Sequence, residues 1–134
     1  MTAPLQQALA TLLAGPRAAA LHEARYNMLA HPYATAYQNS NQWVLETLAA
    51  AYEPAAGTRA QAQAWLRHAG YRPALLHLGT ATRLGARLFR ANVAFDDQPF
   101  GPRMQGRIET VTVDSIVAFL TLRGAVRTRI VRLE

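Results

Sequence analysis

The chain has 134 residues, 51% of them hydrophobic, which is enough for one domain with a modest core and too little for two ordinary domains. All 14 basic residues are arginine and the net charge is +6, while the absence of cysteine excludes disulfides and thiolate metal sites. The apolar stretch from Leu5 to Ala14 is too short to cross a bilayer and lacks a basic leader. We therefore expect neither a transmembrane segment nor a signal peptide there.

The first third of the chain predicts two helices and then a loop. Apolar residues recur at helical spacing over residues 5–13, and Gly15 with Pro16 ends this helix. A second, short helix is expected over residues 16–25. Residues 26–39 contain several aromatic side chains and two residues typical of turns, so they predict a structured loop.

The next two helices are expected over residues 40–52 and 58–70. The first begins at Ser40 and places Trp43, Val44, Leu48 and Ala51 on one stripe, which predicts its buried face. The second begins with a capping box, in which Thr58 is followed three residues later by Gln61. It buries Ala62, Trp65, Leu66 and Ala69 and ends at Gly70.

The last part of the chain predicts a small β region with one clear helix. Residues 74–78 form a short strand or an apolar connection, and a helix starts at Thr80 or Thr82 and runs to Arg90. Residues 92–102 predict a loop. The remaining elements are expected as a strand over 107–113, a helix capped by Asp114 and stopped by Gly124, and a strand over 126–133.

Ser40 is the candidate for chemistry, because it opens a helix inside a polar cluster. A helix N-terminus carries free N–H groups and a partial positive charge, which stabilise an anion. A serine nucleophile also needs a histidine to take its proton, and His31 in the preceding loop is the best local candidate. The alternative is that Ser40 or Asn39 only caps the helix.

The four histidines and the acidic pair complete the set of candidates. His22 and His68 are expected on the surface, and His77 in an apolar segment. No spacing typical of metal ligands occurs, so we expect no metal site and no cofactor. The phrase Asp96-Asp97-Gln98 either forms one wall of a cleft or a turn with Asx bonding.

The segments ALHEARYNMLAHPYATAYQNSNQWVLETLAAAY, AQAWLRHAGYRP, ARLFRANVAFDDQPF and TVDSIVAF carry a resemblance to a known family. Over about Ala18 to Phe119 the chain resembles the C-terminal half of an uncharacterised bacterial family, domain of unknown function 2145. That family is similar to permuted NlpC-like papain-fold hydrolases, in which an early histidine serves a cysteine that opens a later helix. The most specific part of the resemblance is the core from Tyr37 to Trp43.

The resemblance implies an α+β fold like the C-terminal half of a permuted papain-like domain, with helices before a small antiparallel β region. Relative to the family pattern, Ser40 stands where the cysteine nucleophile is expected, and Gln98 where a histidine is expected. The segment that would carry the early histidine is not in this chain. We therefore expect residues 1–134 to form a single domain, incomplete at its N-terminus, that pairs with a missing half or forms a homo-oligomer.

The expected function is that of a catalytically silent relative of these hydrolases, with Ser40 as a remnant of the nucleophile position. A recognition cleft is expected around residues 37–43, formed by Tyr37, Asn39, Asn41, Trp43, Asp96, Asp97 and Gln98.

Two alternatives to this function stay open. One is a non-enzymatic binding or assembly module with an anion-binding face at Arg127, Arg129 and Arg132, nucleic acid not being the expected partner. The other is an amide or peptide hydrolase that uses Ser40. The family implies a bacterial protein, cytoplasmic, or periplasmic if a signal stands upstream.

Overall fold

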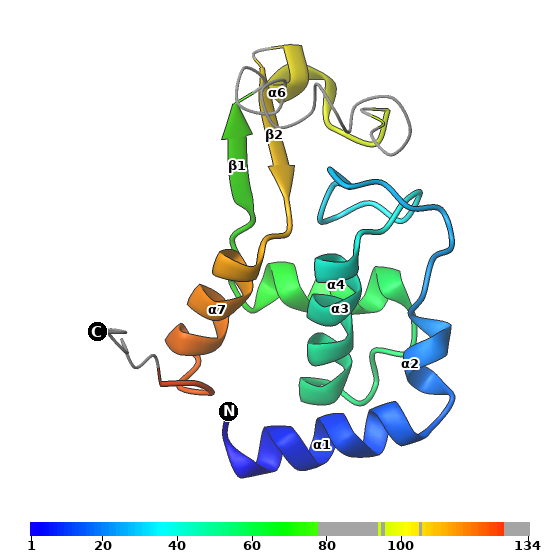
Figure 1. The fold of residues 1–134 in the computed structure, drawn as a ribbon, viewed down its shortest axis with the longest axis vertical. Coiled ribbons are helices and arrows are strands. Elements are labelled where there is room, and N and C mark those ends of the chain that lie inside the picture. The colour runs from blue at the N-terminus through cyan, green and yellow to red at the C-terminus, as the bar shows by residue number, and fades with distance from the viewer. Residues whose placement is uncertain (78–93, 95, 105, 128–134) are drawn as a thin grey trace, which may run out of the picture.

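In this computed structural model, most of the helices gather at one end of the molecule, and a two-stranded antiparallel sheet extends away from them to a further short helix at its far end (Figure 1). The structure describes residues 1–77, 94, 96–104 and 106–127. The elements in chain order are α1 (Ala3–Ala14), α2 (Arg17–Ala20), α3 (Ser40–Tyr52), α4 (Arg59–His68), β1 (Ala74–His77), α6 (Phe100–Met104), β2 (Arg107–Thr110) and α7 (Val113–Leu122). This combination confirms the predicted α+β class. None of the described helices has the length and apolar character that crossing a bilayer requires.

Helix α1 matches its prediction, but α2 ends five residues before the expected Arg25. The chain leaves the helix because side chains take over the backbone groups that would continue it. The Glu23 N–H donates to the Gln38 side chain at 2.9 Å, and the Glu23 carboxylate accepts from the Arg25 N–H at 3.0 Å. Such side-chain bonds compete with the helical ladder. Residues 26–39 then form a loop, as predicted, with no helix or strand of their own.

Helix α3 begins at Ser40, as predicted, because Asn39 caps it and accepts a hydrogen bond from the Gln42 N–H at 2.8 Å. Its predicted buried stripe is wrong in part. Val44 is 43% exposed, whereas Leu45 and the polar Glu46 are almost fully buried. The reason is that α3 packs against α1 on one side and α4 on another, so its buried surface is wider than one apolar stripe.

Helix α4 has both predicted boundaries. Thr58 and Gln61 form the complete capping box at its start. At its end Gly70 takes a φ of +82°, which lets the Tyr71 N–H reach the Leu66 carbonyl at 2.9 Å. This is the Schellman arrangement that glycine permits without strain.

The sheet pairs β1 with β2 antiparallel, from Ala74 opposite Thr110 to His77 opposite Arg107. The predicted second strand was expected to reach Val113, but it ends at Thr110 because α7 starts earlier than expected. Thr112, and not Asp114, caps α7: its hydroxyl accepts from the Ser115 N–H at 3.2 Å. Asp114 instead lies in the first turn, where its charge favours the helix dipole. Gly124 ends the helix with a φ of +68°, as predicted.

The loop predicted over residues 92–102 is wrong at its end, because α6 begins at Phe100. Pro102 fits there because the first turn of a helix has N–H groups without helical partners, so the missing N–H costs little. The helix predicted up to Arg90 lies outside the described residues. Most of the strand predicted over 126–133 does so too, and Val126 and Arg127 are in neither helix nor strand.

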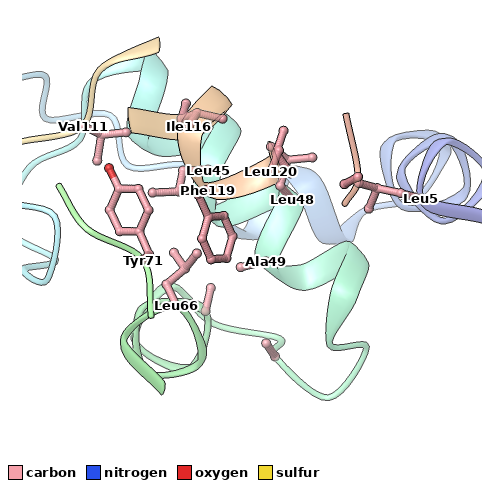
Figure 2. Close-up of a cluster of buried hydrophobic side chains, with 13 residues drawn as sticks. Leu5, Leu45, Leu48, Ala49, Leu66, Tyr71, Val111, Ile116, Phe119 and Leu120 are labelled. Carbon is pink, nitrogen blue, oxygen red and sulfur yellow. The ribbon is translucent and has the colours of Figure 1, made fainter. Parts of the chain in front are cut away.

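The largest apolar cluster lies between α1, α3, α4 and α7 (Figure 2). Leu45 and Leu66 are each 1% exposed at its centre. Phe119 stands edge-on to Trp65 and to Tyr71, with ring centroids 6.2 and 5.7 Å apart. Such T-shaped contacts add to the burial energy of the rings. This cluster holds α3 in place, and the start of α3 carries the candidate site.

Candidate functional site

The start of α3 presents free hydrogen-bond donors next to an exposed hydroxyl. Ser40 is the first residue of the helix and its side chain is exposed. The Gln42 N–H is taken by the Asn39 side chain, and the Trp43 N–H donates to the Asn39 carbonyl at 3.1 Å. Among the described residues, the N–H groups of Ser40 and Asn41 and the Ser40 hydroxyl have no partner. This end of α3 is therefore suited to hold an oxygen that carries negative charge.

A pocket of about 190 Å³ lies at this helix end, and we call it the Ser40 pocket. Its walls come from three places in the chain: the turn after α2, the end of the loop and the first turn of α3. Its lining residues are His22, Glu23, Ala24, Tyr26, Gln38, Asn39, Ser40 and Trp43. Three predicted site residues, Asn39, Ser40 and Trp43, are thus brought together.

Trp43 is fixed in the wall of this pocket. Its indole Nε1–H donates to the Ala18 carbonyl at 3.1 Å, so the ring is tied to α2. Because its polar group is used in this bond, Trp43 offers the pocket the apolar surface of its ring.

His31, the predicted base, does not line the Ser40 pocket. It is 7% exposed, its Nδ1 accepts from the Tyr33 N–H at 3.3 Å, and its Nε2 lies 3.4 Å from a carboxylate oxygen of Glu109 without a hydrogen bond. Burial lowers the pKa of His31 below its usual range, against the opposing effects of the Glu109 and Asp97 carboxylates. The lowered pKa favours the neutral ring, whose proton is on Nε2 because Nδ1 accepts from Tyr33, and Nε2 is directed to Glu109 on β2 instead of Ser40.

His22, predicted to lie on the surface, also lines the Ser40 pocket. Its side chain is exposed, and no hydrogen bond joins it to Ser40 in the described part of the chain. Beside it, hydrogen bonds from the Arg25 side chain and backbone lower the pKa of Glu23 to about 2. Glu23 and Arg25 thus form an exposed ion pair at the pocket edge, with little net charge between them.

Residues 96–98, which were predicted to line the cleft, do not line the Ser40 pocket and instead bond to the loop and to β2. The Tyr37 hydroxyl donates to Asp96 at 3.0 Å, which raises the pKa of Tyr37. Asp97 accepts from the His31 N–H at 2.8 Å. Gln98 is buried, and its amide donates to the carbonyls of Leu29 and Glu109 at 2.8 and 3.0 Å. These bonds fasten residues 96–98 to the loop and to β2.

Two asparagines fasten the start of α3 to the sheet side of the molecule. The Asn39 amide donates to the Met28 carbonyl at 3.1 Å and to the Thr110 hydroxyl at 3.2 Å. The Asn41 amide donates to the Val111 carbonyl at 3.3 Å and does not line the pocket. The pocket floor is therefore positioned by contacts from both the loop and the end of β2.

A buried ion pair holds the loop against α3 and α4. Glu46 is 0% exposed, and its carboxylate accepts from the Arg59 guanidinium at 2.8 and 3.1 Å and from the amides of Gln38 and Gln63 at 2.7 Å each. Arg59 also donates to the carbonyls of Thr35 and Tyr37, at 2.9 and 3.0 Å. Four donors to one carboxylate satisfy the buried charge. Gln38, which this network holds, is itself a wall of the Ser40 pocket.

In the described part of the chain, no group of three or more His, Asp or Glu side chains is placed to hold a metal ion. Of the three arginines proposed as an anion-binding face, Arg127 is exposed, and Arg129 and Arg132 lie outside the described residues. That alternative stays a prediction.

Comparison with known proteins identifies the family. The model of a family of uncharacterised proteins conserved in bacteria (DUF2145) matches residues 1–120. Searches of the curated proteins and of the solved structures found no match. The chain belongs to the DUF2145 family.

Proposed function

We propose that this DUF2145 protein is a binding domain, a catalytically silent relative of papain-like (NlpC-like) hydrolases, whose Ser40 pocket takes a carbonyl or carboxylate oxygen. The observation that carries this proposal is the set of free donors at the start of α3: the N–H groups of Ser40 and Asn41 and the Ser40 hydroxyl. Donors fixed on a helix end stabilise negative charge on oxygen without having to reorganise.

In the part of the chain that the structure describes, no histidine is bonded to Ser40, which supports binding over catalysis. A serine hydroxyl is hardly ionised near neutral pH and becomes nucleophilic when a histidine within hydrogen-bonding distance takes its proton. His31 uses its Nδ1 on Tyr33 and directs its Nε2 to Glu109. A hydrolytic role for Ser40 would therefore fall to His22, which lines the pocket without a bond to Ser40.

Titration with acetate, followed by ¹⁵N NMR, tests the binding half of the proposal. We expect saturable shifts at the amides of Ser40 and Asn41, weakened in Ser40→Ala, which removes one donor and keeps the helix. Sodium chloride at matched ionic strength is the control for screening. Shifts spread over the surface, or equal shifts with chloride, contradict a carboxylate site at this helix end.

Hydrolysis of 4-nitrophenyl acetate tests the silent half. We expect the parent chain and Ser40→Ala to release 4-nitrophenolate at the same rate, because no base among the described residues is placed to activate the Ser40 hydroxyl, and Ser40→Cys should gain no sustained turnover. A faster rate in the parent chain that is lost in both Ser40→Ala and His22→Ala would make the protein a hydrolase.

A further inference from the structure

We propose that the outer face of α4 binds the carboxyl end of a peptide, with Arg67 holding the carboxylate and Gln63 accepting from the backbone N–H beside it. The site is a pocket of about 290 Å³, which we call the Arg67 pocket. It shares none of its described lining residues with the Ser40 pocket. The two sites are therefore independent, and the Arg67 pocket does not depend on the proposed function.

The Arg67 pocket lies between α4 and the loop over residues 26–39. The loop supplies one wall, from Tyr33 to Thr35. The residues of α4 that line the pocket lie on one face of the helix, because positions three and four apart are neighbours there, and they are Ala60, Gln63, Ala64 and Arg67. The short side chains of the two alanines leave the space that longer residues would fill.

Among the described residues, Arg67 is a cation without an anionic partner. No hydrogen bond or ion pair uses its N–H groups there. Its guanidinium lies 4.4 Å from the centroid of the Tyr33 ring, and the Tyr33 hydroxyl donates to the Tyr71 carbonyl at 2.9 Å, so the ring under the cation is held. Contact with the face of a ring leaves the N–H groups at the edge of a guanidinium free, and their planar fork fits a carboxylate.

Gln63 gives the pocket a second, independent polar group. The residue is 5% exposed, and its Nε2 donates to the Ala34 carbonyl at 2.8 Å and to the Glu46 carboxylate at 2.7 Å. These two acceptors fix which end of the amide is the nitrogen. In the described ranges Oε1 accepts no hydrogen bond, and the protein does not fully enclose it. A fixed acceptor beside a free guanidinium favours a ligand with an N–H donor next to its carboxylate.

The last residue of a peptide carries these two groups one carbon apart. Acetate has the anion without the donor. A free amino acid has an ammonium group with three N–H donors, of which the single acceptor on Gln63 satisfies one, and each donor left unpaired in a binding site is costly. A peptide end has one N–H, so it matches the pocket, and capture of a terminal carboxylate is a recurring mode of peptide recognition.

Titration with N-acetylglycine tests the proposal, with the Arg67 Nε–H and the Gln63 side-chain amide followed by ¹⁵N NMR. We expect saturable shifts at both groups. Arg67→Met should weaken binding by a factor of at least about 10, measured at the Gln63 amide, because a charged hydrogen-bond partner is lost. The matched control is Arg72→Met, which removes the same charge from an exposed arginine outside the pocket and should leave the affinity unchanged.

A second ligand tests the part of Gln63. N-Acetylsarcosine has a methyl group in place of the hydrogen on its nitrogen, so it keeps the carboxylate and lacks the donor. We expect it to bind about fivefold more weakly than N-acetylglycine, because one neutral hydrogen bond is lost. Equal affinity for the two ligands overturns the bond to Gln63.

The other outcomes overturn the remaining parts of the proposal. Equal losses of affinity in Arg67→Met and Arg72→Met would mean that net charge, and not Arg67, attracts the ligand. N-Acetylglycinamide, which has no carboxylate, overturns the role of the guanidinium if it binds as tightly as N-acetylglycine. Tighter binding of glycine or of inorganic phosphate overturns the choice of a peptide end. Shifts at the amides of Ser40 and Asn41 without shifts at Gln63 and Arg67 overturn the Arg67 pocket and leave the proposed function intact.

Discussion

The helical end of the molecule and the loop over residues 26–39 are held in place by different kinds of interaction. Leu45, Leu66 and Phe119 fill the space between the helices with apolar contacts, which depend on volume and little on direction. The loop instead depends on hydrogen bonds to the buried Glu46 and Arg59, which are satisfied in one geometry only. The Ser40 pocket lies at the border between the two regions, so the polar region sets the positions of its walls.

The largest effect is expected from breaking the buried ion pair on one side. Arg59→Met leaves the Glu46 carboxylate buried without its cation, and we expect a loss of about 3–5 kcal/mol in the free energy of unfolding, measured with urea. The matched control is Arg67→Met, further along α4, where the exposed guanidinium lies 4.4 Å from the centroid of the Tyr33 ring. That change should cost about 1 kcal/mol or less. Equal costs for the two variants would contradict the difference between the regions.

A pair of substitutions of similar size compares the two regions directly. Leu48→Met conserves volume in the apolar cluster and should cost less than about 1.5 kcal/mol. Gln38→Met also conserves volume, but it leaves the Glu23 N–H without its acceptor and removes one of the hydrogen bonds to the Glu46 carboxylate. We expect about 1–3 kcal/mol for it by urea denaturation. A smaller cost for Gln38→Met than for Leu48→Met would mean that the loop is not held by these bonds.

The two helix caps give a smaller contrast. Thr58→Ala removes an exposed cap from α4 and should cost about 1 kcal/mol. Asn39→Ala removes the cap of α3 together with the bonds to Met28 and Thr110, and we expect it to cost more, about 2 kcal/mol. It should also broaden or shift the Ser40 and Asn41 amide signals, because the pocket floor is loosened. Unchanged amide signals of Ser40 and Asn41 in Asn39→Ala would mean that Asn39 does not position the Ser40 pocket.

The smallest effect is the pH dependence that His31 adds to stability. Burial lowers the pKa of His31 in the folded chain, so the unfolded chain takes up this proton at higher pH than the folded one. Stability should therefore fall as the pH drops below about 6.5. The charged groups that act on the ring are Glu109 and Asp97, which favour its protonation, and Arg67, which opposes it.

The variant His31→Asn keeps an acceptor for Tyr33 and should lose this pH dependence between pH 7 and 5. Asp97, whose pKa is raised by burial, acts in the opposite direction: its proton is held more tightly in the folded chain, so it favours the folded state at more acidic pH. Thermal unfolding between pH 7 and 5, measured in the parent chain and in His31→Asn, separates the effect of His31 on stability from that of Asp97. Equal pH dependence of stability in the parent chain and in His31→Asn would contradict a neutral, buried His31.

The sequence predicted those features that depend on neighbouring residues. Asn39 and Thr58 cap their helices by bonds to residues three positions away, and Gly70 and Gly124 end helices where a positive φ is needed. These are local interactions, so a single sequence is enough to find them.

The candidate site was predicted only in part, because most of it is assembled from distant segments. His22 reaches the Ser40 pocket through the shortened α2, and His31 meets Glu109 only because β2 runs past the loop. Glu46 and Arg59 lie within helices, where a charged residue usually faces solvent. Their burial as a pair follows only from the packing of α3 against α4. No spacing pattern along the chain links these residues.

The expected homo-oligomer stays a prediction, which light scattering of the purified chain tests.

The central claim is that Ser40 binds a ligand without acting as a nucleophile. Incubation with an alkyl fluorophosphonate, a reagent that modifies activated serines, followed by intact-protein mass spectrometry, tests it most directly. The account predicts that the parent chain keeps its unmodified mass, as Ser40→Ala does, because neither His22 nor His31 is bonded to the hydroxyl. A stoichiometric adduct on Ser40 that disappears in His22→Ala would contradict it.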